Sequence, residues 1–171
     1  RVQADLADPD SLARALEGVE AIQHVAGTFD PGPGGEATMH AIHVTATDAL
    51  CAAAHRAGVK RVVVCSSSVT VGFGPRHAPG DEDTAFDPTA IYGRTGALRA
   101  YHDTKLASEE LARSWSARGL EVVVVNPDFV VGAWDIKPTS GTMVLQMARR
   151  WVPVYPRGGK CFIDADDCAQ G

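Results

Sequence analysis

Tyr101 and Lys105 are the residues whose types and spacing most directly suggest chemistry. Residues four positions apart on a helix share one face, so the phenol and the ammonium group can lie side by side. A cation in a partly dry site favours the phenolate and lowers the tyrosine pKa from about 10. The phenol could then give a proton to a carbonyl oxygen near neutral pH. The spacing alone leaves open a simple Tyr–Lys pair on a helix surface.

A run of three serines, Ser66 to Ser68, follows an apolar stretch at 61–65. A hydroxyl at the carboxyl end of a strand can donate a hydrogen bond to an oxygen on which negative charge develops. The alternative is a serine-rich turn that satisfies its own backbone groups. If the fold is a parallel α/β sheet, the serines and the Tyr–Lys pair fall at the same edge, which favours the catalytic interpretation.

The elements that must position these residues follow an alternating pattern of short apolar runs and longer helical stretches. Strands are predicted at 2–6 (a strand end), 21–26, 61–65, 121–126 and 162–164. Helices are predicted from Asp8-Pro9 to Gly18, at 36–57 before Gly58, at 98–118, at 142–151 and from Asp166 onward. Repeated β-α-β units imply a parallel sheet, and ligands bind at the carboxyl ends of its strands.

Composition narrows the function classes. The chain has 171 residues, of which 45% are apolar and 22% charged, and its net charge is −5. No basic run is present, which argues against nucleic acid as a partner, and no apolar stretch is long enough to span a bilayer. The four cysteines have neither CxxC nor zinc-site spacing. We therefore expect no metal, reduced thiols and a cytoplasmic protein without a membrane partner.

Six segments, in this order, carry a family resemblance: 4–8, 24–27, 62–68, the Tyr101/Lys105 pair, 126–132 and 162–167. Together they resemble the extended short-chain dehydrogenase/reductases of the NAD-dependent epimerase/dehydratase superfamily. Within that group they are most similar to the dihydroflavonol reductase and 3β-hydroxysteroid dehydrogenase-like branch. The resemblance implies an α/β fold with a Rossmann-type doubly wound parallel sheet, and NAD or NADP as the cofactor.

The resemblance also implies residue roles. Ser68, Tyr101 and Lys105 match the catalytic set, and Ser68 aligns best of the three serines because it precedes Val69-Thr70-Val71. The expected cofactor contacts are Asp5, Leu6, Val25, Ala26, Gly27, Ser66, Tyr101, Lys105, Pro127 and Val130. The expected partner is a small-molecule carbonyl or alcohol substrate, and a homodimer is left open.

Three departures from the family pattern stand out. The glycine-rich dinucleotide fingerprint is absent. Residues 1–171 are therefore expected to form a partial NAD(P)-binding domain with the start of a substrate-binding region, lacking the first strands of the sheet and a C-terminal part. His43 stands roughly where the family has an asparagine that orients the lysine and a relay water; it either takes that role or lies on a shifted helix. Asn126 replaces the family's usual arginine.

A second tyrosine could be mistaken for the catalytic one. Ile91-Tyr92-Gly93 resembles a common family context, but no lysine lies four residues after Tyr92. We therefore expect Tyr92 to be a packing or substrate-loop residue.

Three functions remain open. The first is a carbonyl reductase or alcohol dehydrogenase, with Tyr101 exchanging the proton, and the second is a nucleotide-sugar epimerase or dehydratase. The stretch 129–132 lacks the Asn-Val-Tyr-Gly pattern of the sugar enzymes, and the long interval from Ser68 to Tyr101 favours the reductase. The third is a non-catalytic dinucleotide sensor, which would not need the acid–base set. Residues that could line a pocket for a hydrophobic or aromatic carbonyl are Phe73, Phe86, Tyr92, Trp134 and Met143.

Overall fold

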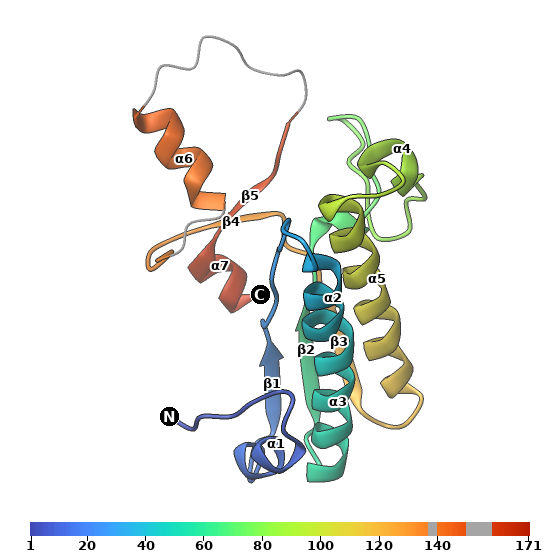
Figure 1. Cartoon of the computed structure of the whole chain (residues 1–171), viewed down its shortest axis with the longest axis vertical. Coiled ribbons are helices and arrows are strands. Elements are labelled where there is room, and N and C mark those ends of the chain that lie inside the picture. Colours follow the sequence, from blue (N-terminus) through green and yellow to red (C-terminus); the bar gives the residue numbers. More distant parts are fainter. Residues whose placement is uncertain (137–139, 150–158) are drawn as a thin grey trace. The chain divides into compact units, whose positions relative to one another are not determined.

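The chain folds into two compact units, Arg1–Asn126 and Pro127–Gly171 (Figure 1). The computed structural model describes residues 1–136, 140–149 and 159–171. Each unit contains its own parallel strands, joined by helical connections. The α/β class and the parallel pairing predicted from the sequence are confirmed.

The first unit is built on a parallel sheet of order β1-β2-β3. The strands are β1 (Ala21–His24), β2 (Arg61–Cys65) and β3 (Glu121–Val125). Residue 61 of the central strand pairs with residues 21 and 121, so all three strands end at one edge. Val62 and Val64 of β2 are buried, as expected for a strand rich in β-branched residues in a parallel sheet.

Two long helical segments lie side by side along one face of this sheet (Figure 1). The first is continuous through α2 (Gly35–His40), a π-helical turn η1 (Ala41–Thr45) and α3 (Ala46–Ala57). The second is α5 (Ala97–Ser116). The core lies between the helices and the sheet, and includes Leu50, Ala54, Val62, Ala112, Trp115 and Leu120. Both helices were predicted to within two residues, apart from the π-turn.

Local sequence signals set several helix ends. The Asp8 side chain accepts a hydrogen bond from the Asp10 backbone N–H and caps α1 (Pro9–Ala15), with Pro9 at the first helical position. Gly58 ends α3 with a φ of 72°, a left-handed conformation that glycine adopts without strain. Two short helices were not predicted: η2 (Ser68–Thr70) and α4 (Pro88–Tyr92), which is capped by Asp87.

The prediction of a strand end at 2–6 is wrong. Residues 1–5 have no regular structure, and Leu6-Ala7 form a turn before α1. The backbone N–H of Asp5 donates to the Ser11 hydroxyl, and its carbonyl accepts from Asp8. No described strand pairs with this segment, and a strand needs the backbone hydrogen bonds of a neighbour.

The second unit pairs β4 (Phe129–Val131) with β5 (Phe162–Asp164) in parallel. Its helices are α6 (Ser140–Arg149) and α7 (Ala165–Gln170), the latter capped by the Asp164 side chain. The sequence predicted β5 and both helices but not β4, and residues 150–151 of the predicted 142–151 helix lie outside the described residues.

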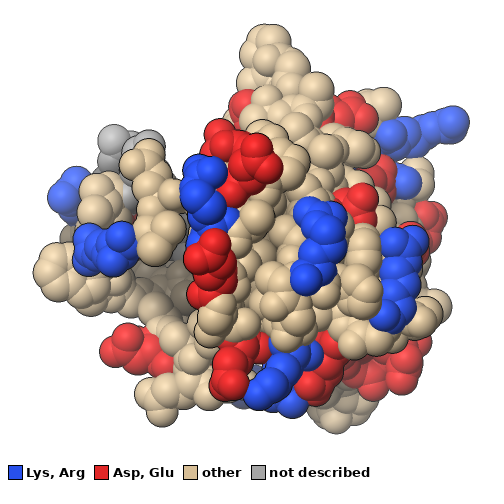
Figure 2. Space-filling model, turned by 90° about the horizontal axis from the view of Figure 1, so that it is seen from below, with Lys and Arg blue, Asp and Glu red and all other residues tan. Residues whose placement is uncertain are grey.

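Charged side chains of both signs are interspersed on the face drawn in Figure 2. Two ion pairs of the first unit, Lys60–Glu20 and Arg61–Glu121, are exposed. Among the described residues, no helix combines the length and apolar character needed to cross a membrane.

Candidate active site

Tyr101 and Lys105 share the side of α5 that faces the strand ends, as their spacing predicted. Lys105 is buried, with only 7% of its surface exposed, and its Nζ donates a 3.1 Å hydrogen bond to the Cys65 carbonyl at the end of β2. Nζ lies 6.0 Å from the centre of the Tyr101 ring. The pair is therefore part of the packed interior edge of the sheet and not a solvated helix-surface pair.

The pKa of Tyr101 is shifted in the opposite direction from the one predicted. Burial raises the pKa of Tyr101, and hydrogen bonding by the Ser67 side chain partly opposes this rise. Burial lowers the pKa of Lys105, and electrostatic interactions with Cys65 and Glu109 oppose that fall. The predicted lowering of the Tyr101 pKa by Lys105 is wrong for this structure, because Nζ is turned toward the Cys65 carbonyl and burial dominates.

The three serines occupy different environments. Ser66 is buried and its hydroxyl donates to Glu109 Oε1 at 2.5 Å. Ser67 is the serine whose side chain hydrogen-bonds the Tyr101 phenol, which works to lower the pKa of Tyr101. Ser68 begins η2 and is half-buried. The catalytic role of Ser68 and the cofactor role of Ser66 stay predictions, and Ser67 joins them as a residue that the motif alignment did not select.

Gly27, in the segment after β1, marks a place of close approach. A Cβ atom added at this residue would lie 3.2 Å from Lys105 Nζ and 3.6 Å from His43 Nε2. Only glycine leaves room for the lysine at this point without moving a neighbour. Val25, two residues earlier, is 73% exposed, so this segment has both a tightly packed side and an open side.

His43 lies at the site, on the π-helical turn between α2 and α3. Its ring is buried and packs edge-on to the Tyr101 ring, with centroids 5.5 Å apart. The Thr28 backbone N–H donates to Nε2 at 3.1 Å, which makes Nε2 an acceptor and assigns the ring proton to Nδ1. Nδ1 lies 2.9 Å from the Thr104 hydroxyl oxygen. Both nitrogens are engaged, and the helix is not shifted away from the site.

The ring stays neutral in this environment. Burial and the positive charge of Lys105 lower the pKa of His43 to about 4. A π-turn is rare within helices and often occurs at functional sites. Here the π-turn carries His43, whose ring packs against Tyr101 and lies near Gly27.

The remaining predicted cofactor residues lie apart from this cluster or in the second unit. Asp5 is exposed and its carboxylate accepts from the Ala7 backbone N–H, while Leu6 packs against the core. Pro127 and Val130 belong to the second unit. The cofactor roles of these four residues stay predictions.

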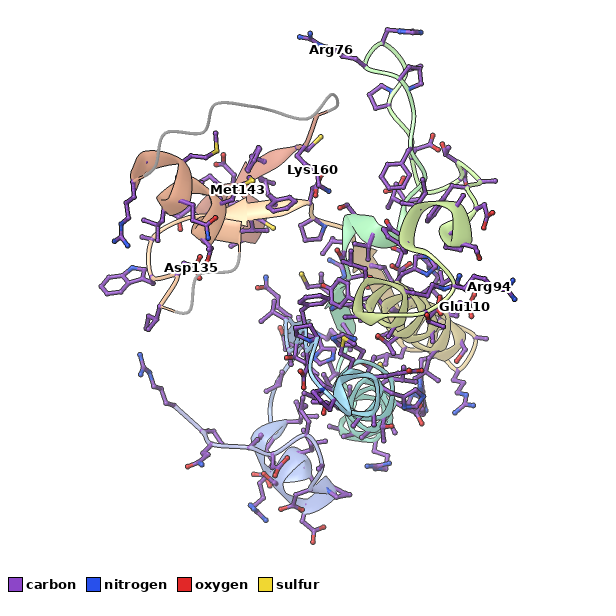
Figure 3. The ribbon with its side chains drawn as sticks, turned by 45° about the horizontal axis from the view of Figure 1, so that its top comes forward. Arg76, Arg94, Glu110, Asp135, Met143 and Lys160 are labelled. Carbon is purple, nitrogen blue, oxygen red and sulfur yellow. The ribbon has the colours of Figure 1, made fainter. Side chains whose placement is uncertain are left out.

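The predicted apolar pocket residues fall into two groups. Phe86 contacts Phe73, Tyr92 and His102 edge-on in the first unit, and the Tyr92 hydroxyl donates to the Val69 carbonyl, so Tyr92 packs as predicted. In the second unit, Trp134 borders a hollow of about 400 Å³ with residues of β4 and α6. Met143 of α6 (Figure 3) is not part of its lining.

Two further residues at the site were missed by sequence reasoning. Phe29 packs edge-on against Tyr101, with centroids 5.6 Å apart, and is 47% exposed. Glu109 is a buried carboxylate four residues after Lys105. Glu109 could have been found from the sequence, because its spacing from Lys105 puts a charged residue on the face of α5 that is buried. Among the described residues, no cluster of His, Cys, Asp and Glu could hold a metal ion.

Parallel strands with polar groups gathered at their carboxyl edge define a Rossmann-type α/β protein. The model of the NAD dependent epimerase/dehydratase family matches residues 1–171, and the chain belongs to this family. The family depends on NAD, as its description states.

Relatives and solved structures agree with this assignment. The chain is 35% identical over 170 residues to Sterol demethylase protein B of Methylococcus capsulatus, covering 98% of this chain and 49% of the relative. It is 31% identical to a putative dihydroflavonol 4-reductase of Synechocystis sp., covering 99% and 48%. The chain thus spans about half the length of these curated relatives. MoeE5, solved with UDP-glucuronic acid and NAD, has a TM-score of 0.73 and 26% identity, covering 96% of this chain and 55% of that one.

Proposed function

We propose that this chain carries the acid–base half of an NAD(P)-dependent oxidoreductase that reduces a ketone or aldehyde, or oxidises the corresponding alcohol. The carrying observation is the buried Lys105 beside the half-buried Tyr101 at the carboxyl ends of the strands, with the Ser67 side chain hydrogen-bonding the phenol. Residues 1–171 form part of an NAD(P)-binding domain, together with the start of a substrate-binding region.

Each residue of the pair has a distinct task in this proposal. Tyr101 gives its phenolic proton to the carbonyl oxygen during reduction, and takes it back during oxidation. A hydroxyl of the serine segment donates a hydrogen bond to that oxygen as negative charge develops on it; Ser68 is the motif residue and Ser67 the one that acts on Tyr101. Lys105, fixed by its hydrogen bond to the Cys65 carbonyl, supplies a positive charge on the same helix face as Tyr101.

The residues present fit a dinucleotide at this edge. Gly27 leaves a gap against Lys105 that a Cβ atom would fill, and Val25 and Ala26 precede it at the end of β1. We assign these residues, with Tyr101 and Lys105, to the nicotinamide side; Asp5, Leu6, Ser66, Pro127 and Val130 are the further contacts proposed from the family motifs. When bound, the cofactor supplies or accepts the hydride.

A reductase acting on hydrophobic or aromatic carbonyl compounds is favoured by Phe29. Its half-exposed ring stands against Tyr101, so an apolar surface adjoins the proton donor. The putative dihydroflavonol 4-reductase among the relatives supports the same class. We also propose a cytoplasmic location, which suits the reduced cysteines, and a homodimer stays a prediction.

The test is replacement of Tyr101 in the full-length protein. Turnover of a panel of aromatic ketones, aldehydes and 3-oxosteroids would be followed by NADH and NADPH absorbance. Tyr101→Phe should lower turnover by about a hundredfold or more. Tyr92→Phe, which also removes one phenolic hydroxyl, should leave turnover within about twofold. Unchanged turnover in Tyr101→Phe would show that the catalytic assignment is wrong.

A nucleotide-sugar epimerase or dehydratase is the second candidate, favoured by the likeness to MoeE5 with its bound UDP-glucuronic acid. A rise in melting temperature with UDP- or dTDP-sugars, and none with apolar ketones, would select it. Nicotinamide binding without turnover of either panel would instead favour a dinucleotide sensor.

A further inference from the structure

The carboxylate of Glu109 is the most heavily hydrogen-bonded acidic group near the site. Only 3% of the residue is exposed. Three donors converge on Oε1: the Ser66 hydroxyl at 2.5 Å, the Thr70 hydroxyl at 2.6 Å and the Asn126 amide nitrogen at 2.8 Å. Oε2 accepts from the half-exposed Arg113 guanidinium at 2.8 Å. A buried carboxylate is tolerated when its charge is paired and its oxygens are hydrogen-bonded, as they are here.

These donors come from three different parts of the first unit. Ser66 and Thr70 are the first and last residues of the serine segment, residues 66–70, which follows β2. Asn126 follows β3, and Glu109 itself lies on α5, one helical turn beyond Lys105. One side chain therefore connects the ends of two strands to the helix that carries Tyr101 and Lys105.

The network extends from Glu109 to Ser67. The Asn126 amide nitrogen lies 2.9 Å from the Thr70 hydroxyl oxygen and 3.3 Å from the Ser67 carbonyl oxygen. The Thr70 hydroxyl also lies 2.9 Å from that carbonyl. Thr70 has a single hydroxyl proton, which goes either to Glu109 or to the Ser67 carbonyl, so the other contact with that carbonyl is the one from the Asn126 amide. The Ser67 side chain hydrogen-bonds the Tyr101 phenol, which opposes the rise of the Tyr101 pKa on burial.

We propose that Glu109 is a positioning residue of the proposed reductase site, which fixes segment 66–70 relative to α5, the helix that carries Tyr101 and Lys105. This inference rests on the proposed function. In this role Asn126 links β3 to the carboxylate as a neutral donor, and Arg113 supplies the positive charge from the same helix.

The charge of Glu109 bears on Lys105 as well. It raises the pKa of that lysine, against the lowering by burial. The other titratable groups that interact with Lys105 are Cys65 at the end of β2, His24 at the end of β1 and His43 on the π-turn. Removing the carboxylate charge should therefore make the first proton of the Tyr101–Lys105 pair leave at lower pH.

The experiment compares Glu109→Gln with Glu110→Gln in the full-length protein. Glu110 (Figure 3) is the next residue on α5 and is exposed. Glu110→Gln therefore controls for the loss of one carboxylate charge from α5 at a position outside the hydrogen-bond network. The probe is the carbonyl compound reduced fastest in the panel described above. Glu109→Gln should lower kcat about tenfold with a smaller change in KM, because a misplaced serine segment affects the reacting geometry.

The pH profile gives a readout that a purely structural role would not move. Reduction needs the Tyr101–Lys105 pair protonated, so the alkaline limb of kcat/KM should move to lower pH in Glu109→Gln. A kcat within twofold of the unsubstituted protein and an unmoved alkaline limb, as expected of Glu110→Gln, would overturn the proposal.

A second variant and a hydrogen-exchange measurement also test the positioning role of Glu109. If Glu109→Gln does not fold, Thr70→Val decides, because it removes one donor of the network while keeping the side-chain shape; it should lower kcat in the same way, and an unchanged kcat would refute the positioning role. Hydrogen exchange of the amides at 66–71 should be faster in either variant and unchanged in Glu110→Gln. If Tyr101→Phe retains full turnover, the proposed function is wrong. The positioning of residues 66–70 by Glu109 is then judged from hydrogen exchange alone: faster exchange in Glu109→Gln supports it and unchanged exchange contradicts it.

Discussion

The two units of the chain differ sharply in how much they bury. The first unit contains every buried apolar and polar residue found among the described residues, including Lys105, Glu109 and His43. In the second unit no described residue is buried, and Trp134 and Ile136 are 91% and 86% exposed. Side chains in the first unit are thus held in a packed interior, whereas the contacts between side chains of the second, such as Lys160 with Asp128, involve no described residue that is buried.

This difference shows where preorganised chemistry can be located in the chain. A catalytic group needs a fixed position and a defined electrostatic environment, which buried hydrogen bonds provide. Lys105, buried and hydrogen-bonded to the Cys65 carbonyl, has such surroundings in the first unit, and Tyr101 and Ser67 are half-buried there. The hollow beside Trp134 in the second unit is bordered by exposed side chains, which suits contact with a ligand better than proton transfer.

The largest expected effect separates two lysines, one from each unit. Lys105→Met removes the buried cation of the site and should lower turnover by about a hundredfold. Lys160→Met removes a partly exposed lysine (Figure 3) that pairs with Asp128, and exposed ion pairs contribute little. Turnover should stay within about twofold. The measurement is steady-state NAD(P)H oxidation, and equal losses in both variants would mean that the second unit holds part of the catalytic machinery.

A smaller effect is expected on stability. Leu50 of α3 is 5% exposed and belongs to the core, so Leu50→Ala should lower the free energy of unfolding by about 3 kcal/mol. Leu145 of α6 is 43% exposed, and Leu145→Ala should change it by less than about 1 kcal/mol. Urea denaturation of the two variants measures both values. A loss at Leu145 as large as that at Leu50 would contradict the difference in burial between the units.

The fold could be predicted wherever periodicity and end signals agreed. The valine runs of β2 and β3, the caps at Asp8 and Gly58 and the length of α5 are local features, and each was predicted to within two residues. The strand end expected at 2–6 failed because strand formation depends on a neighbour and not on the segment alone. Strand β4, with three residues, is too short for an alternation pattern to indicate.

The site could be predicted only in part. Tyr101 and Lys105 share one helix face by spacing, and burial of the lysine confirmed that they belong to the interior edge. The hydrogen bond from Lys105 to the Cys65 carbonyl, the choice between Ser67 and Ser68 as partner of the phenol, and the contacts of Glu109 depend on how three chain segments meet. Those relations arise from tertiary packing, which residue types and spacing do not encode.

The third prediction concerns pH and belongs to the first unit alone, because all six histidines lie before residue 127. The pKa of His43 falls from 6.5 to about 4 on folding, through burial and the charge of Lys105. Between these values the unfolded chain binds a proton that the native chain does not, so stability is lost as pH falls from 6.5 toward 4. At pH 5 the loss from His43 should be about 2 kcal/mol relative to neutral pH.

His43→Gln isolates this contribution, because glutamine keeps a polar side chain but does not titrate. The fall in unfolding free energy between pH 7 and pH 5 should be smaller in this variant by about 2 kcal/mol. Part of the pH dependence should remain, since burial also lowers the pKa of His24. His40→Gln, at an exposed position on α2, is the matched control and should leave the pH dependence unchanged. Equal pH dependence in His43→Gln and the unsubstituted protein would mean that His43 is not held neutral beside Lys105, and that the first unit is less tightly packed at the π-turn than its hydrogen bonds indicate.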